Sequence, residues 1–336
     1  MGKEEMKRIC VIGAGAWGTA MAAVLAEKSK RRVYLVGHDD AYVKQMAKKR
    51  ENPKFLPGYK FHDAIEITTD GAMAIADAQL ILSGVPSKYL RSTWSELGPL
   101  APKGAPIVSL TKGIENKTFR RSTEIIREYV GRKNQVTCLS GPSHAEEVAK
   151  GLPTTVTIAT PNLKLAAILQ KEISTPTFRA YTNRDLFGVE FSGAMKNVIA
   201  LAAGINDGLG FGDNTKSALL TRGLAEIITL GCAMGAKRKT FYGMAGVGDL
   251  ITTAFSPFGR NRAVGERLGK GETLEDILAT SAHVAEGVET TRSVYNLAKG
   301  MKIEMPITSE VFQVLFKKKD PRTAVSRLMT RRYKGE

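Results

Sequence analysis

The stretch that decides the fold is "ICVIGAGAWGTAMAAVLAE", residues 9–27. Its first residues are apolar and predict a buried strand, and its last ten are mostly small and apolar and predict a helix. Between them, Gly13, Gly15 and Gly18 follow the order GxGxxG. Between a strand and a helix, such a turn lets the backbone approach a pyrophosphate at the helix N-terminus. An ordinary glycine-rich turn is the plainer alternative, and we favour dinucleotide binding.

Short apolar runs continue this pattern to about residue 181, with helical stretches such as 17–28 and 40–50 between the early ones. These runs are compact and rich in Val and Ile, which is typical of strands buried on both faces. They are "RICVIG" (8–13), "RVYLVG" (32–37), "IEIT" (65–68), "LILSGV" (80–85), "PIVSL" (106–110), "VTCLSG" (136–141) and "TTVTIA" (154–159). The alternation predicts an α/β fold with a Rossmann-like, doubly wound and mostly parallel sheet.

After about residue 185 the strand signal ends and helical patterns follow, at roughly 185–207, 214–235, 259–269 and 287–300. We therefore expect a dinucleotide-binding Rossmann domain over 1–184 and an all-helical substrate-binding domain over 185–336. Asn183 or Asp185 is placed to cap the first helix of the second domain. Gly and Ala at the helix seams permit close packing, within one chain or between the chains of a homodimer.

The chain of 336 residues has a formal net charge of +16. Its Lys and Arg residues are spread along the sequence, without a zinc-finger or RNA-binding aromatic signature. A basic surface that attracts anionic metabolites is favoured over nucleic-acid binding. The sequence has no apolar run of membrane-spanning length and no apolar stretch of signal-peptide length before the first strand. We expect a cytoplasmic protein without an integral membrane segment.

The three cysteines, Cys10, Cys138 and Cys232, are widely spaced, odd in number and set in apolar runs. We interpret them as core residues in a reducing compartment. Only four histidines are present, and no pair has metal-ligand spacing, so we expect no metal site.

Polar residues follow two of the predicted strands. Lys112 comes just after one strand, and Gly141, Ser143 and Ala145 come after the next. Ligands of open α/β sheets bind outside the carboxyl ends of the strands, so both segments are expected on the cofactor side. Alternatively, Lys112 is a solvated lysine, and Ser143 caps a helix at 144–150 with Glu146 completing a capping box.

A second polar cluster lies in "AGVGDLITTAFSPFGRNRAVG", residues 245–265. A glycine-rich loop delivers Asp249 and two threonines, and Arg260 and Asn261 follow at the expected start of a helix. The planar fork of arginine suits phosphate, and asparagine adds donors. A solvated arginine is the plainer interpretation.

Lys196 lies in the apolar stretch "VEFSGAMKNVIALAAGINDG", residues 189–208. Its neighbours one helical turn away are Ser192, Gly193, Ile199 and Ala200, none of which is a carboxylate. A buried lysine loses affinity for its proton unless a carboxylate offsets the loss, which suits an acid/base catalyst. The alternative is a lysine that extends out of a core helix to solvent.

His38 ends the second predicted strand, where NAD-preferring sites usually have a carboxylate for the ribose hydroxyls. Asp39 is one residue late, and Arg31 and Arg32 lie just before the strand. We therefore expect use of NADP, alone or with NAD, while a surface histidine remains the plainer alternative.

Over roughly residues 8–330, the sequence resembles the NAD(P)-dependent glycerol-3-phosphate dehydrogenases of the bacterial type. The matching stretches are "VIGAGAWGTA", "NPKFLPG", "TKGIE", "LSGPSHAEEVAKGLPT", "GVEFSGAMKNVIALAAGINDGLGFGDNTKSALLTRGLAEI", "AGVGDLITTAFSPFGRN", "VAEGVETTRSV" and "EMPITSEVFQVLF". The chain departs from the family pattern at Val36, where many members have Trp, at Ala254, where Cys is common, and at Gly259, where Ser is common. These departures affect adenine packing and hydrogen bonding within the loop, not the proton donor.

The resemblance implies interconversion of dihydroxyacetone phosphate and sn-glycerol 3-phosphate with NAD(P)H, including NADPH, to supply glycerophospholipid synthesis. It makes Lys196 the catalytic proton donor. The implied contacts to the small phosphorylated substrate are Lys112, Gly141, Ser143, Lys196, Asp249, Gly259, Arg260 and Asn261. The implied cofactor contacts are Gly13, Gly15, Ala16, Trp17, Gly18, His38, Lys112, Ala145, Arg260, Val284 and Glu286.

Two other classes of protein share some of these features. A related two-domain dehydrogenase of hydroxy acids or hydroxyacyl thioesters would share the Rossmann half, but "GRN" after "GDL" would have no role in it. A basic protein that binds nucleic acid or a membrane surface would not need Lys112, Lys196 and Asp249.

Overall fold

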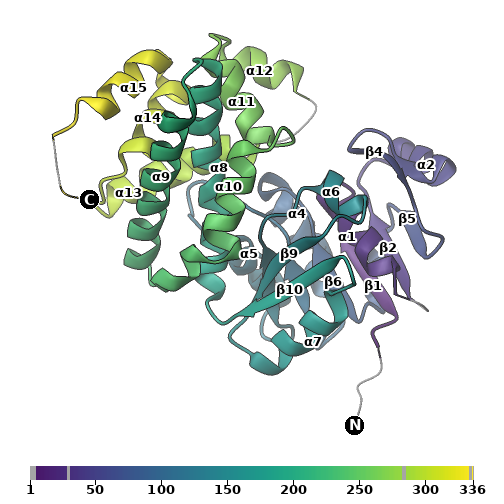
Figure 1. The fold of residues 1–336 in the computed structure, drawn as a ribbon. Coiled ribbons are helices and arrows are strands. Elements are labelled where there is room, and N and C mark those ends of the chain that lie inside the picture. Colours follow the sequence, from purple (N-terminus) through teal and green to yellow (C-terminus); the bar gives the residue numbers. More distant parts are fainter. Residues whose placement is uncertain (1–4, 29–30, 282–284, 333–334, 336) are drawn as a thin grey trace. The chain divides into compact units, whose positions relative to one another are not determined.

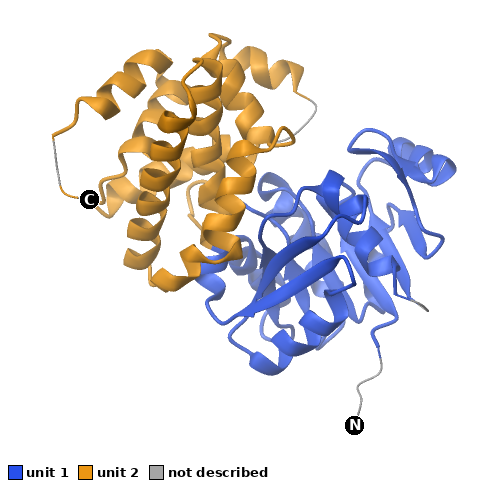
Figure 2. Ribbon diagram, in the orientation of Figure 1, with its two compact units in different colours: residues 1–112, 121–190 blue, residues 113–120, 191–336 orange. Residues whose placement is uncertain are grey.

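The computed structural model describes residues 5–28, 31–281, 285–332 and 335. The chain divides into two compact units (Figure 2), here called unit 1 (residues 1–112 and 121–190) and unit 2 (residues 113–120 and 191–336). This division assigns residues 113–120 to the helical unit and falls within the helix that begins at Leu186. The functional boundary at 184/185 stays a prediction.

Unit 1 is built on an eight-stranded sheet in the order β10-β9-β8-β7-β6-β1-β2-β5 (Figure 1). All neighbouring strands are parallel except β8 and β9, which are antiparallel. The strands are β1 (Arg8–Ile12), β2 (Arg32–Val36), β5 (Ile65–Thr68), β6 (Leu80–Ser83), β7 (Ile107–Ser109), β8 (Val136–Ser140), β9 (Thr154–Ala159) and β10 (Phe178–Asn183). The predicted doubly wound, mostly parallel sheet is confirmed. The sequence missed β10 and a separate antiparallel hairpin of β3 (Glu51–Asn52) and β4 (Leu56–Lys60).

Both faces of this sheet are covered. Ile9 and Val11 of β1 enter one core together with residues of α1, α6 and α7. Cys10 and Ile12 point to the opposite face and share a core with Trp94 of α4. The helical segments of unit 1 are α1 (Ala16–Ala26), α2 (Asp40–Lys49), α3 (Gly71–Ala76), α4 (Ser87–Leu97), η1 (Gly98–Leu100), α5 (Ser122–Val130), α6 (Ala145–Ala149) and α7 (Leu163–Ile173).

The cysteines largely match the expectation of core residues. Cys10 and Cys138 are buried, and all three thiols are free. Burial raises the pKa of the Cys10 thiol to about 12, so it carries no reactive thiolate at neutral pH. Cys232 differs from the expectation because it is only partly buried, near the end of helix α9.

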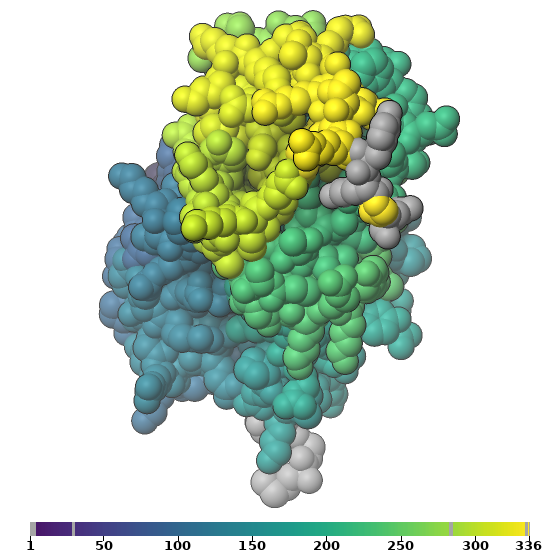
Figure 3. All heavy atoms as spheres, turned by 90° about the vertical axis from the view of Figure 1, so that its left-hand side faces the viewer, coloured from purple at the N-terminus to yellow at the C-terminus, as the bar shows by residue number. Residues whose placement is uncertain are grey.

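Helices make up nearly all of unit 2. They are α8 (Leu186–Gly208), whose first residues belong to unit 1, α9 (Asp213–Ala233), η2 (Arg238–Tyr242), η3 (Met244–Gly248), α10 (Asp249–Phe255), α11 (Arg260–Gly269), α12 (Leu274–Thr280), α13 (Glu286–Gly300), α14 (Pro306–Lys317) and α15 (Pro321–Met329). Asp185 caps α8, because its Oδ1 accepts a hydrogen bond of 2.9 Å from Gly188 N. The C-terminal helices α14 and α15 lie on the outside of this unit, as the yellow atoms in Figure 3 show.

Helices α8 and α11 touch through their backbones. A Cβ atom at Gly204 of α8 would collide with the carbonyl oxygen of Arg262, and one at Gly265 of α11 would collide with that of Leu201. The glycine faces of these two helices are therefore used within one chain. Close packing within the chain was one of the two arrangements left open by the sequence, and a homodimer stays a prediction.

Of the described residues, only α8 forms a helix long and apolar enough to cross a membrane, and 89% of its apolar window is buried inside the protein. Such burial is what the central helix of a packed helical unit requires. Its apolar character therefore has a packing explanation.

We predict that Gly265→Ala lowers the free energy of unfolding by about 1–3 kcal/mol, because the added methyl group forces α8 and α11 apart. Gly300→Ala is the matched control, since a Cβ at Gly300 meets nothing within 4 Å. Urea unfolding of both variants and the parent measures the difference. Equal stability of the two variants would mean that the contact between α8 and α11 adapts at little cost.

Candidate active site

The glycine turn of unit 1 has the backbone geometry that its sequence predicts. Gly13 has a φ of 106°, and a Cβ there would lie 2.8 Å from the backbone of Gly84. A Cβ at Gly18 would collide with the carbonyl oxygen of Gly13, whereas one at Gly15 would meet nothing within 4 Å. Two glycines thus close the turn, and the third leaves open space over the backbone where α1 begins.

Ala16 and Trp17 form the first turn of α1, whose N-cap is Gly15. The Trp17 ring packs in the sheet core, with its centroid 6.4 Å from that of Phe178. Its indole Nε1 is buried and has no hydrogen-bond partner among the described residues. The ring is partly buried against the core, and the backbone N–H of Trp17 is one of the first N–H groups of α1, which lack partners within the helix and suit an anion.

The two acidic side chains that follow β2 both make local hydrogen bonds. His38 is followed by Asp39, whose Oδ1 accepts a hydrogen bond of 2.9 Å from Tyr42 N and so caps α2. Asp40 accepts a short hydrogen bond from the hydroxyl of Thr69. Both acidic side chains after the strand are therefore engaged in local structure.

Lys112, Gly141 and Ser143 come together beyond the ends of β7 and β8. Lys112 Nζ donates to the carbonyl oxygen of Gly141 at 3.1 Å, and Ser143 Oγ donates to the same oxygen at 2.9 Å. Gly141 has a φ of 145°, and a Cβ there would lie 3.0 Å from Val156 Cα. The predicted convergence of these two segments is thus present.

Ser143 is not the cap of the following helix. The N-cap of α6 is His144, without a side-chain capping bond, and Ala145 is the first helical residue. The alternative in which Ser143 and Glu146 form a capping box is therefore wrong. The extended backbone before the helix reaches one residue further than the sequence pattern suggested.

Lys196 has partners that its own helix does not supply. Its side chain is buried, with the residue 6% exposed, and its ammonium group forms an ion pair with Asp249 and a hydrogen bond of 2.6 Å with Thr253 Oγ1. Both partners lie on α10, one helical turn apart. The sequence pattern placed Thr253 only among the two threonines after a glycine-rich loop. Its spacing of four residues from Asp249 indicated that both side chains lie on one face of a helix.

Arg260 and Asn261 are the first residues of α11, after the N-cap Gly259. Arg260 is exposed, whereas Asn261 is 7% exposed and its Oδ1 accepts from Gly287 N at 2.9 Å. A Cβ at Gly259 would lie 2.8 Å from the Thr253 carbonyl oxygen, so the loop is tighter than a serine there would allow. Glu286 begins α13 nearby, because the next residue is the one bonded to Asn261. Val284 lies outside the described residues.

A partly buried charge cluster fixes the loop that precedes Arg260. Arg262 donates to Asp207 Oδ2 at 2.8 Å and to the Ser256 carbonyl oxygen at 3.1 Å, and Lys216 Nζ lies 2.9 Å from Asp207 Oδ2. Burial opposes ionisation of Asp207, but the bonds from Lys216 and Arg262 hold its pKa below the usual value. The loop is thus tied to the end of α8.

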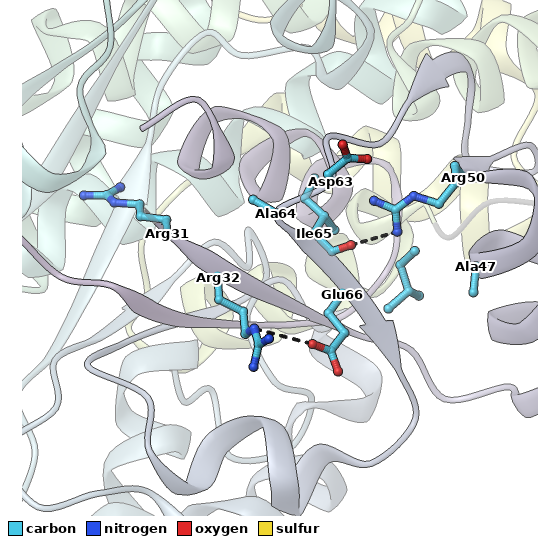
Figure 4. A pocket seen from close by; sticks show the side chains of 9 residues that line it. Arg31, Arg32, Ala47, Arg50, Asp63, Ala64, Ile65 and Glu66 are labelled. Atoms are coloured by element: carbon cyan, nitrogen blue, oxygen red, sulfur yellow. Dashed lines mark hydrogen bonds and ion pairs between the residues drawn. The ribbon is translucent and has the colours of Figure 1, made fainter. Parts of the chain in front are cut away.

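Unit 1 also has a hollow away from the glycine turn. A hollow of about 340 Å³ (Figure 4) lies beside Arg32, Arg50 and Glu66, at the amino ends of β2 and β5. Ligands of such sheets bind at the carboxyl ends, so this hollow is separate from the glycine turn. In the described part of the chain, no group of three His, Cys, Asp or Glu side chains is placed to hold a metal ion.

Unit 1 has a doubly wound sheet with an open glycine turn, and unit 2 buries a lysine paired with an acid. These features define the class of nicotinamide-dependent dehydrogenases. Comparison with known proteins narrows this class. The N-terminal model of NAD-dependent glycerol-3-phosphate dehydrogenase matches residues 8–166, and the C-terminal model matches residues 185–326. The chain belongs to the NAD-dependent glycerol-3-phosphate dehydrogenase family.

Individual relatives agree over the full length. The chain is 47% identical to a glycerol-3-phosphate dehydrogenase [NAD(P)+] of Geobacillus kaustophilus, covering 98% of this chain and 96% of the relative. It is also 47% identical to that of Citrifermentans bemidjiense, with coverage of 98% and 99%. The crystal structure of the Coxiella burnetii glycerol-3-phosphate dehydrogenase is similar with a TM-score of 0.93 and 36% identity, over 97% of this chain and 99% of that one.

Proposed function

We propose that the chain interconverts dihydroxyacetone phosphate and sn-glycerol 3-phosphate with NAD(P)H. The observation that carries the proposal is the buried Lys196 held by Asp249 and Thr253, in a chain of this dehydrogenase family. The proposed setting is the cytoplasm, where the product would supply glycerophospholipid synthesis.

The described residues of unit 1 fit a dinucleotide. Gly15 leaves open space over the turn, and the first N–H groups of α1 face it as donors for a pyrophosphate. Lys112, Ala145 and His38 are the further contacts that the proposal assigns to the cofactor in this unit, and Arg260, Val284 and Glu286 are those in unit 2. When bound, the reduced nicotinamide supplies the hydride for C2 of the substrate.

Lys196 is proposed as the proton donor. As hydride reaches the C2 carbon, the ammonium transfers a proton from Nζ to the carbonyl oxygen, and it takes the proton back in the reverse direction. The adjacent Asp249 carboxylate favours the charged ammonium form, and the bond to Thr253 fixes the position of Nζ. Lys112 adds positive charge, and Gly141 and Ser143 complete the proposed polar surface for the substrate.

Arg260 and Asn261 are proposed to bind the phosphate. Arg260 is exposed at the N-terminus of α11, where the helix dipole and the backbone N–H groups also favour an anion. Asn261 Oδ1 accepts from Gly287 N, and its Nδ2 is the group proposed to donate to the phosphate. This phosphate site favours the proposed substrate over hydroxy acids and hydroxyacyl thioesters, for which the loop has no role.

The first prediction tests the activity and the cofactor. Purified protein with dihydroxyacetone phosphate should oxidise both NADH and NADPH, because His38 follows β2 at the position where NAD-preferring sites usually have an acid. His38→Asp should lower kcat/KM for NADPH relative to NADH by at least about tenfold, through like-charge repulsion. Absorbance of the reduced nicotinamide measures each rate. Turnover with NADH alone at saturating concentrations of both cofactors would contradict dual use, and no turnover with either would contradict the function.

The second prediction tests the proton donor. Lys196→Met should still bind NADPH but lose about 10²–10⁴ in kcat. Lys216→Met is the control, because Lys216 is equally buried and equally paired with an aspartate, and because its link through Asp207 to the loop before Arg260 should affect KM for dihydroxyacetone phosphate more than kcat. It should lose stability while its kcat falls much less. A similar kcat loss in the two variants would assign the effect to a disturbed fold.

The third prediction tests phosphate recognition. Arg260→Ala should lower the ratio of kcat/KM for dihydroxyacetone phosphate over dihydroxyacetone by roughly 10- to 150-fold, measured at saturating cofactor. Arg260→Lys should recover only part of the loss, because it keeps the charge without the planar fork. Arg267→Ala, on the last turn of the same helix, is the control. An unchanged ratio in Arg260→Ala would move phosphate recognition to Lys112 or to the start of α6.

A further inference from the structure

A fully hydrogen-bonded amide side chain in unit 1 contacts the glycine turn from outside it. Asn52, in β3, is fully buried. Its Nδ2 donates to the Ala14 carbonyl oxygen at 3.0 Å and to Thr19 Oγ1 at 2.8 Å. Its Oδ1 accepts from the Tyr42 hydroxyl at 2.6 Å and from Phe55 N at 3.2 Å. Both donors and both acceptor positions of the amide are therefore used.

Two of these bonds are local, whereas those to Ala14 and Thr19 span 38 and 33 residues of sequence. Ala14 lies inside the glycine turn and Thr19 lies on α1, while Tyr42 lies on α2 and Phe55 lies in the hairpin loop between β3 and β4. A saturated buried amide tolerates only one orientation, because rotating it by half a turn would place donors against donors. The position of the glycine turn is thus fixed by a residue outside it.

The bond to Ala14 has a direct consequence for anion binding. In a trans peptide the carbonyl and the following N–H point in opposite directions. Because Asn52 holds the Ala14 carbonyl oxygen, the N–H of Gly15 is turned away from Asn52. The same residue has open space beside it, because a Cβ at Gly15 would meet nothing within 4 Å.

We propose that Asn52 is a positioning residue for the cofactor, which aims the Gly15 N–H at the pyrophosphate of NAD(P)H through the Ala14 peptide. The inference rests on the proposed use of NAD(P)H. A purely structural role, in which Asn52 only anchors the β3–β4 hairpin, predicts a loss of stability without a loss of cofactor affinity in the folded protein.

The test compares NADPH affinity with stability in the full chain. Asn52→Asp keeps the shape but replaces the two-donor group with an acceptor that faces the Ala14 carbonyl oxygen. We expect the Kd for NADPH, measured by nicotinamide fluorescence without substrate, to rise on the order of tenfold, as the loss of an aligned hydrogen bond implies. The value of kcat at saturating NADPH should change much less.

Asn134→Asp is the matched control. Asn134 is also buried, and its Nδ2 donates to two backbone carbonyl oxygens, those of Pro102 and Ala105, outside the glycine turn. Thermal unfolding should show a loss of stability in both variants, whereas the Kd should rise only in Asn52→Asp. A parent-like Kd in folded Asn52→Asp, or an equal rise in Asn134→Asp, would overturn the proposal.

A milder variant covers the case in which Asn52→Asp does not fold. Tyr42→Phe removes one bond to Oδ1 and loosens the amide without adding charge, so the Kd should rise by about two- to fivefold, and an unchanged Kd would overturn the proposal. The parent protein separates this inference from the proposed function. If the parent does not bind NADPH, the proposed use of the cofactor fails, whereas parent binding with unaffected variants refutes only the role of Asn52.

Discussion

In each unit, the candidate site residues depend on places where two backbones meet without room for a Cβ. In unit 1, Gly18 of α1 packs on the carbonyl of Gly13, which sets how closely α1 follows β1. In unit 2, Gly204 and Gly265 let α8 and α11 pack on each other's carbonyl groups. Backbone contacts of this kind cannot adjust by rotamer changes, so they fix the helix ends that carry the polar groups.

The helices fixed in this way carry buried charged side chains, and each of these needs a partner. An ion removed from water is tolerated only when it is paired and hydrogen-bonded. Glu190 shows the structural form of this rule, since it accepts bonds from Arg121, Ser122 and Thr123 and joins α8 to the start of α5. The pair of Lys196 and Asp249 obeys the same rule. The lysine ammonium, however, is also a proton source, which a carboxylate held by four donors is not.

The sequence predicted the features that depend on neighbouring residues. The strand periodicity, the glycine turn and the start of α8 at Asp185 are local signals, and the structure has them. The antiparallel pairing of β8 and β9 depends on how a connection crosses the sheet, which strand composition does not encode. The local sequence offers Lys196 no carboxylate, and Asp249 could be placed near it only through the family resemblance, because the two residues lie 53 positions apart. Asn52 was missed for the same reason, since its bonds reach Ala14 and Thr19 across α2.

The end of β2 shows how a local structural need can bear on cofactor choice. A carboxylate for the ribose hydroxyls would have to come from Asp39, because His38 holds the position before it. Asp39 already caps α2, and losing such a cap costs about 1 kcal/mol. Turning this carboxylate to a ribose would exchange one hydrogen bond for another at the expense of the helix. The capping role of Asp39 and the presence of His38, at the position where NAD-preferring sites usually have an acid, support the proposed use of NADPH beside NADH.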